Sequence, residues 1–423
     1  SSDLIVNCCM KKWLVALFTL FFTIAAAGQM SIKGVVVNDA TGLPIVGSSV
    51  FISNSSKGTV SNNSGQFELN NIPPGKYDLV ISCIGYETNV MAVSDAQLPL
   101  RLKVELTLKA KELENVIVEP SIEEGWDKWG KMFMENFIGS TQNALQCNIK
   151  NTNKIRFRYY KKSNRVIAYC NEPVLIENKA LGYTLKYQLE NFEVNYKDRT
   201  TFYLGYPLFE DMTKDGKQIK GRWAKNRQEA FKGSVTHFMQ ALYSNKLAAE
   251  DFEVRRMVRG PNLEKERVKA IYKATVISNG ETNGNGVSII ISGKAPDTGG
   301  DSSAYYQRIM RQPDQLDVYG STILTADSII VANEGRYKGL HFNDYLYITY
   351  KGEKEEEAYL RTQMEKRSAT FQRSLVILIN GELITLDEAG SYFNPQDFLT
   401  SGYWGWSEKM ANLLPTDYVI YEK

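Results

Sequence analysis

The two histidines of the chain, His237 and His341, are the side chains with the widest range of possible chemistry. A hydrolytic zinc site needs two closely spaced ligands, such as His-x-x-Glu, and a third ligand further along the chain, with a fourth position left open. Gln240 and Asp344 stand three residues after the two histidines. Gln240 is a poor zinc ligand, and no histidine follows Asp344 to complete a set. We therefore expect no metal and no other cofactor.

Nucleophilic and phosphate-binding motifs are also incomplete. A Ser-His-Asp or Cys-His relay would depend on one of the two histidines, and the sequence contains no G-x-S-x-G elbow. The glycine-rich segment 279–288, "NGETNGNGVS", matches neither a Walker pattern nor G-x-G-x-x-G, so it predicts a hairpin turn. His237 is predicted to be a solvated side chain on a helix, and His341 a hydrogen-bonded structural residue beside a strand.

Acidic residues are numerous but form no recognisable catalytic pair. Paired carboxylates could support glycoside hydrolysis, yet the 48 acidic residues single out no pair. The segment 351–361, "KGEKEEEAYLR", is a charge run and predicts a solvated face. A hydrolase therefore stays open as an alternative without assigned catalytic residues.

An aromatic cluster near the C-terminus and a basic stretch are the two candidate ligand-binding features. The rings of 403–406, "YWGW", would stack against sugars or peptide prolines if exposed, and would cap a core if buried. The basic stretch 154–165 could meet an anionic glycan or lipid head group, or form the polar face of an exposed strand. The predicted ligand surface comprises Tyr392, Tyr403, Trp404, Trp406, Arg156 and Arg158.

The overall composition is that of an ordinary globular protein. Of the 423 residues, 43% are hydrophobic and 23% are charged, with 50 Lys and Arg against 48 Asp and Glu. This length accommodates two or three domains, each with its own core. Because the charges nearly balance, no long-range field favours nucleic acid, and we predict no nucleic-acid partner.

The N-terminus has the pattern of a secretory signal. Met10, Lys11 and Lys12 make a basic start, the segment 13–27 is an apolar run of 15 residues, and 25–29 offers small residues for cleavage. The run is shorter than the roughly 18 to 20 residues of a membrane-spanning helix, although an uncleaved anchor stays as the alternative. We assign residues 1–29 to upstream residues plus a signal peptide, and expect an exported protein with no transmembrane segment after signal removal.

The number and positions of the cysteines favour free thiols over a disulfide framework. Cys8 and Cys9 lie before the apolar run, where no lipid-attachment cysteine would stand. Cys83 shares the inward phase of an alternating run, which predicts a buried free thiol. Cys147 and Cys170 could pair in an oxidising compartment, and the sequence leaves that pairing open.

From residue 31 to about residue 108, short strand-like runs are separated by turn formers. "KYDLVIS" alternates apolar and polar residues, and "DATGLP" and "NNIPPG" supply the Gly, Pro, Asn and Asp of tight turns. About seven such runs, with turns every 8 to 12 residues, predict a small antiparallel β-sandwich over 30–108.

Many residues of this region occur in one order that resembles a known module. They are Gly34-x-Val36, Asp39, Thr41-Gly42-x-Pro44, Gly47, Val50, Gly58-Thr59, Gly65-x-Phe67, Ile72-Pro73-x-Gly75-x-Tyr77 and Gly85-Tyr86. The order resembles the carboxypeptidase regulatory-like module of exported Bacteroidota proteins. The resemblance implies a transthyretin-like, seven-stranded sandwich that accompanies a peptidase, an outer-membrane receptor or another exported partner. The incomplete zinc pattern indicates that this chain lacks the carboxypeptidase itself.

Beyond residue 108 the pattern of the sequence changes. The charged stretch 109–124 predicts a linker, and the aromatic residues of 126–137 then recur at helical spacing. A second long helix is expected over 222–250, among strand-like runs that include 268–278. This mixture predicts an α+β domain over 125–423.

The larger domain is similar to an uncharacterised region found beside the module in exported Bacteroidota proteins. The matching stretches are "WDKW" with "FIGST", "ENKALGYTLKYQL", "FYLGYPLF" and "GYWGWSEKMANLLPTDY". This likeness implies a coherent domain and transfers no catalytic residue.

The predicted function is that of a non-catalytic exported accessory or binding protein of the bacterial cell envelope, in the periplasm or at the outer membrane. An envelope protein, a glycan or a peptide is the expected partner. One alternative is an exported hydrolase of the peptidase or glycosidase type, and another is an adaptor for a TonB-dependent outer-membrane receptor. A cleft with two or more buried carboxylates would favour the hydrolase, whereas a shallow aromatic or basic surface would favour binding.

Overall fold

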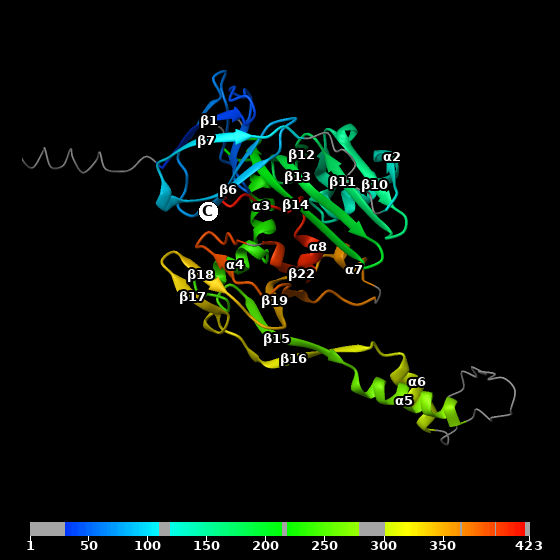
Figure 1. Ribbon diagram of the computed structural model, residues 1–423. Helices are drawn as coiled ribbons and strands as arrows, with labels where there is room; N and C mark the ends of the chain where they lie inside the picture. Colours follow the sequence, from blue (N-terminus) through cyan, green and yellow to red (C-terminus); the bar gives the residue numbers. More distant parts are fainter. Residues whose placement is uncertain are drawn as a thin grey trace, which may run out of the picture.

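The computed structural model describes three β-rich bodies; in Figure 1 the first two lie side by side in the upper half and the third lies below them. The described residues are 30–109, 119–213, 218–278, 301–363, 366–393 and 395–418. The expected signal peptide (1–29) and the glycine-rich segment 279–288 lie outside them. Among the described residues, no helix has both the length and the apolar character needed to cross a membrane.

The N-terminal body is a β-sandwich of seven strands, as predicted. The strands are β1 (Ile32–Asn38), β2 (Ser49–Ile52), β3 (Gly58–Val60), β4 (Gln66–Leu69), β5 (Lys76–Ser82), β6 (Asn89–Ser94) and β7 (Leu100–Leu106). One sheet has the order β4-β1-β7 and the other β3-β2-β5-β6. Alternating residues such as Leu79 and Ile81 fill the space between the sheets. The sandwich is not wholly antiparallel, because β1 and β7 pair in parallel.

The second body is a seven-stranded antiparallel sheet. It contains β8 (Ser121–Glu124), β9 (Cys147–Ile149), β10 (Ile155–Tyr160), β11 (Arg165–Cys170), β12 (Val174–Asn178), β13 (Tyr183–Asn195) and β14 (Thr200–Asp211). Helix α2 (Trp126–Phe133) and the π-helical turn η2 (Met134–Ile138) pack Phe133 and Phe137 into its core. Strand β8 comes from the end of the predicted linker 109–124 and pairs with β10, so Ser121–Glu124 belongs to this sheet.

The third body combines a five-stranded sheet with a three-stranded one. The five strands are, in spatial order, β16 (Gln315–Ile323), β15 (Phe252–Pro261), β19 (Tyr345–Lys354), β20 (Phe371–Leu378) and β22 (Phe398–Gly402). The three are β17 (Ile330–Glu334), β18 (Tyr337–Leu340) and β21 (Ile384–Leu386). Helix α4 (Val235–Tyr243) lies in their shared core.

Two of the expected elements differ in the structure. The single helix predicted over 222–250 is two helices, α3 (Gly221–Phe231) and α4, because Gly233 between them has a φ of +70°. The strand-like run 268–278 belongs to helix α5 (Leu263–Ser278), whose Lys265 N–H donates to the Asn262 side chain at 3.0 Å. The N-terminal cap therefore stabilises a helix here, although the β-branched residues of that run favour a strand.

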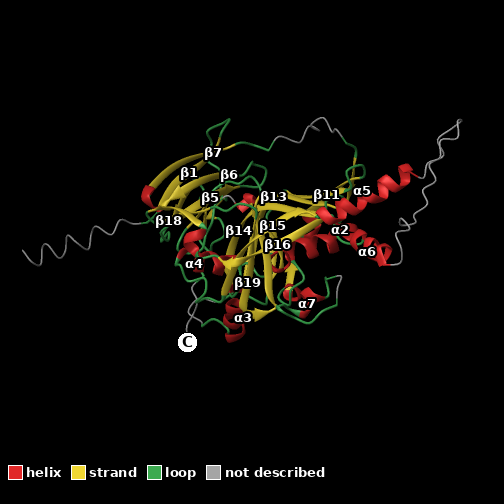
Figure 2. Ribbon diagram, turned by 90° about the horizontal axis from the view of Figure 1, so that it is seen from below, coloured by secondary structure: helices red, strands yellow, loops and turns green. Residues whose placement is uncertain are grey.

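Strands β15 and β16 extend past the rest of their sheet and carry a helical hairpin. Figures 1 and 2 both show α5 and α6 (Asp301–Met310) projecting away from the three bodies. Two short helices, α7 (Glu357–Leu360) and α8 (Tyr403–Ser407), complete the set of described α-helices.

The C-terminal segment 398–418 contacts all three bodies. Trp404 lies in the core of the third body. Met410 N–H donates to Phe137 O at 3.2 Å in the second body. Thr416 N–H then donates to Asn54 O at 2.8 Å in the sandwich. One stretch of chain thus joins the three bodies.

The sandwich also contacts the second body directly. Ser55 forms a parallel bridge with Leu208 of β14, and Asn54 N–H donates to Pro207 O at 2.8 Å. Leu208 packs with the buried side chains of Phe51 and Val80 in a small apolar cluster of its own. These contacts fix the sandwich against β14.

We expect Leu208→Ala to weaken this docking by about 2 to 3 kcal/mol, because the substitution leaves a cavity against Phe51 and Val80. Differential scanning calorimetry should then show the sandwich melting earlier than the remainder of the chain. Leu204→Ala, on the same strand at a residue 37% exposed, is the matched control and should leave the profile nearly unchanged. Equal effects of the two substitutions would contradict this account of the docking.

Candidate functional site

The turn 232–234, which joins α3 to α4, packs against the core of the third body. Gly233 N–H donates to His237 Nδ1 at 3.1 Å, and Gly233 O accepts a hydrogen bond from Trp404 Nε1 at 2.6 Å. A Cβ at Gly233 would lie 2.5 Å from the ring of Tyr350, so a side chain does not fit here. The turn therefore holds an aromatic core on one side and leaves polar groups on the other.

Two half-buried carboxyl groups, Glu353 and Glu356, interact with each other, and the first also lies near Lys232 of the turn. Glu353 accepts a hydrogen bond from Gln372 Nε2 at 3.4 Å. Glu356 accepts one from the hydroxyl of Tyr403 at 3.4 Å and another from the backbone N–H of Gln142. The partners come from the second and third bodies, so this carboxyl pair lies at the seam between them.

The environment of the pair disfavours ionisation. Burial raises the pKa of Glu353 and that of Glu356 above the ordinary value for glutamate. The negative charge of Glu229 raises both values further, whereas the nearby ammonium of Lys232 lowers that of Glu353. Such a pair can keep a proton at a higher pH than an exposed carboxyl, which is the property that a general acid requires.

Aromatic rings border the carboxyl pair. The ring of Tyr403 lies 5.4 Å from that of Trp406 and 5.1 Å from that of Tyr359, measured between centroids. Trp406 is half-buried, and its Nε1 donates to Ser140 Oγ at 2.8 Å. Carboxylates, an amide and a partly exposed indole thus lie in one place, a combination that can bind a polar ligand with an apolar face.

The predicted ligand surface is therefore only partly assembled. Tyr403 is 4% exposed and Trp404 2% exposed, so the prediction of an exposed stacking surface is wrong for these two rings. Their apolar area is buried in packing, where it stabilises the fold. Tyr392 is half-buried and packs on Phe398. Trp406 is the member of the YWGW cluster that both borders the carboxyl pair and keeps an exposed part.

The two predicted arginines lie elsewhere. Arg156 and Arg158 project from β10 on the face opposite to its core residue Phe157. Arg156 Nη1 donates to Asn153 O at 2.7 Å, and the guanidinium of Arg158 lies 4.8 Å from the centre of the Tyr169 ring. Strand β10 pairs on both sides, with β8 and β11, so it is not an edge strand.

The structure also tests the predictions made for the histidines and the cysteines. His237 is 7% exposed, so the prediction of a solvated surface residue is wrong; its Nε2 lies 3.2 Å from Glu250 Oε2, and burial lowers its pKa. His341 is half-buried, and its backbone N–H donates to Ile329 O at 3.1 Å. The cysteines at 83, 147 and 170 are free thiols, and that at 83 is only half-buried.

The carboxyl pair was missed because it lies in the run 351–361, which the sequence indicates as a solvated face. A bulge between Tyr350 and Lys354 shifts the register of β19 against β20 and turns the run inward. Glu355 is consequently buried and ion-paired with Arg367 at 2.5 Å. Gly352, the one glycine of this charged run, was the one signal of irregular backbone.

A third carboxyl group, Glu408, is half-buried on the other side of the same turn. It accepts a hydrogen bond from Val235 N–H at the start of α4, and burial raises its pKa to about 7. Its charge in turn raises the pKa of Tyr203 and of Tyr392, both of which burial already raises. The adjacent Lys409 has a pKa lowered by burial.

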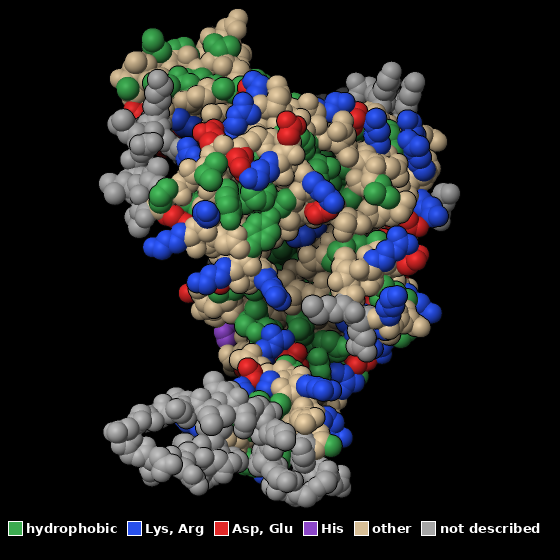
Figure 3. Space-filling model, turned by 90° about the vertical axis from the view of Figure 1, so that its right-hand side faces the viewer, with side chains coloured by type: hydrophobic (Ala, Val, Ile, Leu, Met, Phe, Trp, Pro, Cys, Tyr) green, Lys and Arg blue, Asp and Glu red, His purple; other side chains and the backbone are tan. Residues whose placement is uncertain are grey.

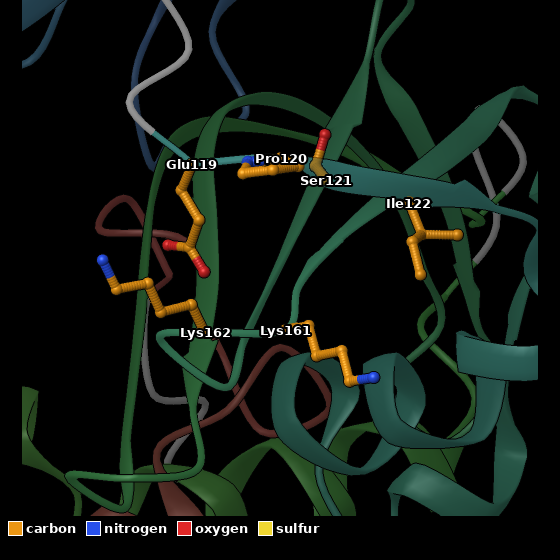
Figure 4. Close-up of a pocket in the computed structure, with 6 residues that line it drawn as sticks. All are labelled: Glu119, Pro120, Ser121, Ile122, Lys161 and Lys162. Carbon is orange, nitrogen blue, oxygen red and sulfur yellow. The ribbon is translucent and has the colours of Figure 1, made fainter.

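A separate pocket of about 400 Å³ lies where β8 meets the turn after β10 (Figure 4). Glu119, Pro120, Ser121, Ile122, Lys161 and Lys162 line it. The Glu119 carboxylate is already engaged by Ser163 N–H at 2.8 Å. Across the face shown in Figure 3, basic and acidic side chains are mixed rather than gathered into a field of one sign. Within the described ranges, no group of three or more His, Cys, Asp or Glu side chains is arranged to hold a metal ion.

The fold and the sequence place the chain among proteins that carry a regulatory-like β-sandwich beside a larger domain. The family model of the CarboxypepD_reg-like domain matches residues 32–118. The chain is therefore a carboxypeptidase regulatory-like domain-containing protein. None of the curated proteins matches it.

Several solved structures are similar to parts of the chain. A mutant type II cohesin–X-dockerin complex from Acetivibrio cellulolyticus is 23% identical over 18% of this chain and 52% of that chain, with a TM-score of 0.15. A Bacteroides uniformis protein, provisionally described as carbohydrate-binding, is 12% identical over 43% and 79%, with a TM-score of 0.14. A Bacteroides fragilis protein of unknown function, provisionally described as membrane-associated, is 8% identical over 89% and 96%, with a TM-score of 0.15. The chain spans about half of the first of these, and such low TM-scores transfer no function.

We expect Glu408→Gln to remove a pH dependence of stability. The folded-state pKa of about 7 lies above the ordinary 4.5, so the wild type loses stability as pH rises from about 4.5 to 7, by about 3 kcal/mol in all. The glutamine keeps an acceptor for Val235 N–H but does not titrate. Thermal melts at pH 5 and pH 8 should show the variant gaining on the wild type at the higher pH.

The matched control for this measurement is Glu135→Gln, at a glutamate whose side chain is 57% exposed. Its melting temperature should follow that of the wild type at both pH values. If Glu408→Gln also follows the wild type, the carboxyl is not held protonated at neutral pH in the folded state.

Proposed function

We propose that this chain is a non-catalytic, exported accessory protein of the bacterial cell envelope that binds a glycan or peptide at the seam beside Trp406. The CarboxypepD_reg-like domain supports an accessory role. Its docking on β14 and on the C-terminal segment supports a function of the whole chain rather than of a loosely tethered module. The envelope location and the Bacteroidota origin are part of this proposal and follow from the signal-like N-terminus and the sequence resemblance.

The observation that carries the binding proposal is the position of Trp406. Its partly exposed indole rests on Tyr403 and Tyr359, and Tyr403 contacts the carboxyl of Glu356. A sugar ring or a proline can stack on an indole while its polar groups bond to neighbouring acceptors. Because the indole is held by Ser140 Oγ, little side-chain entropy remains to be lost on binding.

We expect Trp406→Ala to abolish ligand binding with little loss of stability. The wild-type chain would first be screened on glycan and proline-rich peptide arrays, and the strongest probe then titrated by calorimetry. Trp129→Ala is the matched control, since Trp129 is another half-buried tryptophan, in contact with Tyr159 rather than with the carboxyl pair. Equal loss of affinity in the two variants, or no wild-type binding on either array, would contradict the proposal.

The carboxyl pair supports a second candidate, an exported hydrolase of the glycosidase or peptidase type. Glu353 and Glu356 both have raised pKa values and lie beside the same aromatic rings. In that case one carboxyl would protonate the leaving group and the other would activate water or attack the substrate.

We expect the hydrolase candidate to be decided by Glu353→Gln and Glu356→Gln, assayed with chromogenic glycosides and peptides. If the wild type hydrolyses a substrate, both variants should lose at least about a hundredfold in kcat, because general acid–base catalysis contributes about that much. If the wild type binds but hydrolyses nothing, the non-catalytic proposal stands. Hydrolysis that survives both substitutions would exclude this pair as its site.

A further inference from the structure

Strand β16 forms one edge of the five-stranded sheet. It pairs with β15, and no described strand pairs with its other side. All nine of its residues are exposed. In Figure 1, β15 and β16 reach beyond the other strands of the sheet toward α5 and α6. An edge of this kind presents unpaired N–H and C=O groups to solvent.

The hydrogen bonds to β15 show which backbone groups of β16 face outward. Asn262 N–H donates to Asp314 O at 2.8 Å, one residue before β16 begins. In an antiparallel ladder the backbone groups of successive residues point to opposite sides, so the even-numbered residues up to 318 bond to β15. The N–H and C=O groups of Gln315, Asp317 and Tyr319 therefore point away from the sheet.

The regular part of this edge ends at Tyr319. The register of β15 against β16 shifts between Arg255 and Met257, which marks a bulge beyond this point. Arg255 Nη1 donates to Gly320 O at 3.3 Å and to Ser321 O at 2.5 Å, so these two carbonyls already accept hydrogen bonds. An incoming strand can therefore pair regularly with the five residues that end at Tyr319.

The segment 315–319 lacks the features with which proteins usually protect an edge. Lysine, proline and bulges discourage strand pairing, and none of these occurs within the five residues. Their single charge, Asp317, forms a bidentate ion pair with Arg259, at 2.6 and 2.9 Å. An exposed edge without such protection pairs readily with another strand.

The part of the sheet that carries this edge is a two-stranded ribbon. Strand β19 pairs with β15 only as far as Met257, whereas β16 pairs with β15 as far as Pro261. A two-stranded ribbon is marginally stable in water, and a third strand adds both hydrogen bonds and packing. A strand added beside β16 would therefore stabilise the ribbon and also satisfy the free edge.

One face of the ribbon exposes aliphatic side chains. Leu316 is 41% exposed, Val318 64% and Val258 40%. Val258 pairs with Val318, and Leu316 lies two residues along the same strand, so the three side chains share a face. A strand beside β16 would place alternate side chains against Leu316 and Val318. Aliphatic side chains at those two positions would bury this apolar surface.

A second copy of β16 is a poor occupant of this edge. The segment 315–319 pairs with an identical antiparallel segment over its full length only when the two-fold axis passes through Asp317. The two Asp317 carboxylates would then lie directly opposite each other, and like charges in that position are destabilising. The edge therefore favours a different strand, with a residue other than Asp or Glu opposite Asp317.

We propose that the edge of β16 binds an extended peptide segment of another protein by antiparallel strand addition. The backbone of the peptide bonds to Gln315, Asp317 and Tyr319, while two aliphatic side chains of the peptide, separated by one residue, cover the aliphatic face. The residue between them lies opposite Asp317 and is neutral or basic. Main-chain hydrogen bonds supply affinity in this mode, and the alternate side chains supply specificity.

This site is separate from the ligand-binding seam proposed above. Strand β16 lies at the opposite edge of the five-stranded sheet from β22, which leads into α8 and Trp406. The two proposals can therefore fail independently of each other.

The first test uses a soluble seven-residue probe, acetyl-Lys-Thr-Val-Thr-Val-Thr-Lys-amide, in which two valines flank the central threonine. We expect the full chain to bind a fluorescent copy of it with a dissociation constant below about 1 mM. Hydrogen exchange should slow in the segment 315–319 when the probe is bound. No binding up to about 1 mM, or protection of another segment instead, would overturn the proposal.

The second test examines the hydrogen-bond pattern with two N-methylated probes. The threonines lie opposite the outward-facing residues of β16, so N-methylation of the three threonines should weaken binding at least about tenfold. The N–H groups of the two valines point away from β16, and a probe methylated there should bind within about threefold of the original. Equal effects of the two modifications would overturn the strand-addition geometry.

The third test compares Asp317→Pro with Asp317→Ala. Both variants lose the ion pair with Arg259, and the proline also removes the outward N–H. Because that N–H does not bond to β15, the proline is tolerated in the ladder. We expect Asp317→Pro to bind the probe at least about tenfold more weakly than Asp317→Ala. Equal affinity of the two folded variants would overturn the proposal.

Two further measurements control this comparison. Val331→Lys, at a residue 59% exposed on β17, should bind the probe like the wild type, and circular dichroism would confirm that each variant is folded. Sedimentation velocity without the probe should show a monomeric wild type up to about 100 μM. A wild-type dimer that Asp317→Pro dissociates would show that a second copy occupies the edge, and would overturn the proposal of a peptide.

Discussion

The structure depends on one stretch of chain near the C-terminus, residues 398–418, which is packed into or hydrogen-bonded to every body in turn. Trp404 fills the core of the third body, Met410 and Ala411 enter that of the second, and Thr416 reaches the sandwich. Each of these contacts spans a large separation in sequence. Because closing such long loops costs entropy, the contacts of this segment have to offset that cost, and they couple the three bodies.

The same segment concentrates titratable groups at the seam that it closes. Glu356 lies against Tyr403, and Glu408 lies at the start of α4, both within an otherwise aromatic and aliphatic environment. Removing a carboxyl group from water disfavours its charged form, which accounts for the raised pKa of each. Ligand sites commonly occur at such junctions between domains, because a junction offers concave surface together with polar groups from two directions. The seam therefore both connects the second and third bodies and forms the candidate ligand-binding site.

Local sequence patterns predicted a helix or strand best where interactions between residues close in sequence determine it. The alternation and turn residues of the sandwich predicted its seven strands, and the spacing of Phe133 and Phe137 predicted the helix that buries them. The run 268–278 was misassigned because its β-branched residues favour strands, whereas capping by Asn262 decides for a helix. His237 was misplaced because the break at Gly233 changes which face of α4 meets the core.

The sequence by itself determined the sandwich, its family and the mixed α and β character of the larger domain. These properties follow from periodicity, turn chemistry and ordered glycines, which act within a few residues of one another. Only the tertiary structure decided which aromatic rings are buried and which carboxyl groups meet. Trp404 and Trp406 are two residues apart in one cluster, yet the first lies in a core and the second at the seam. Their environments are set by Gly233 and Ser140, which are distant in sequence, and by the bulge of β19. Burial depends on such long-range packing, and no local pattern encodes it.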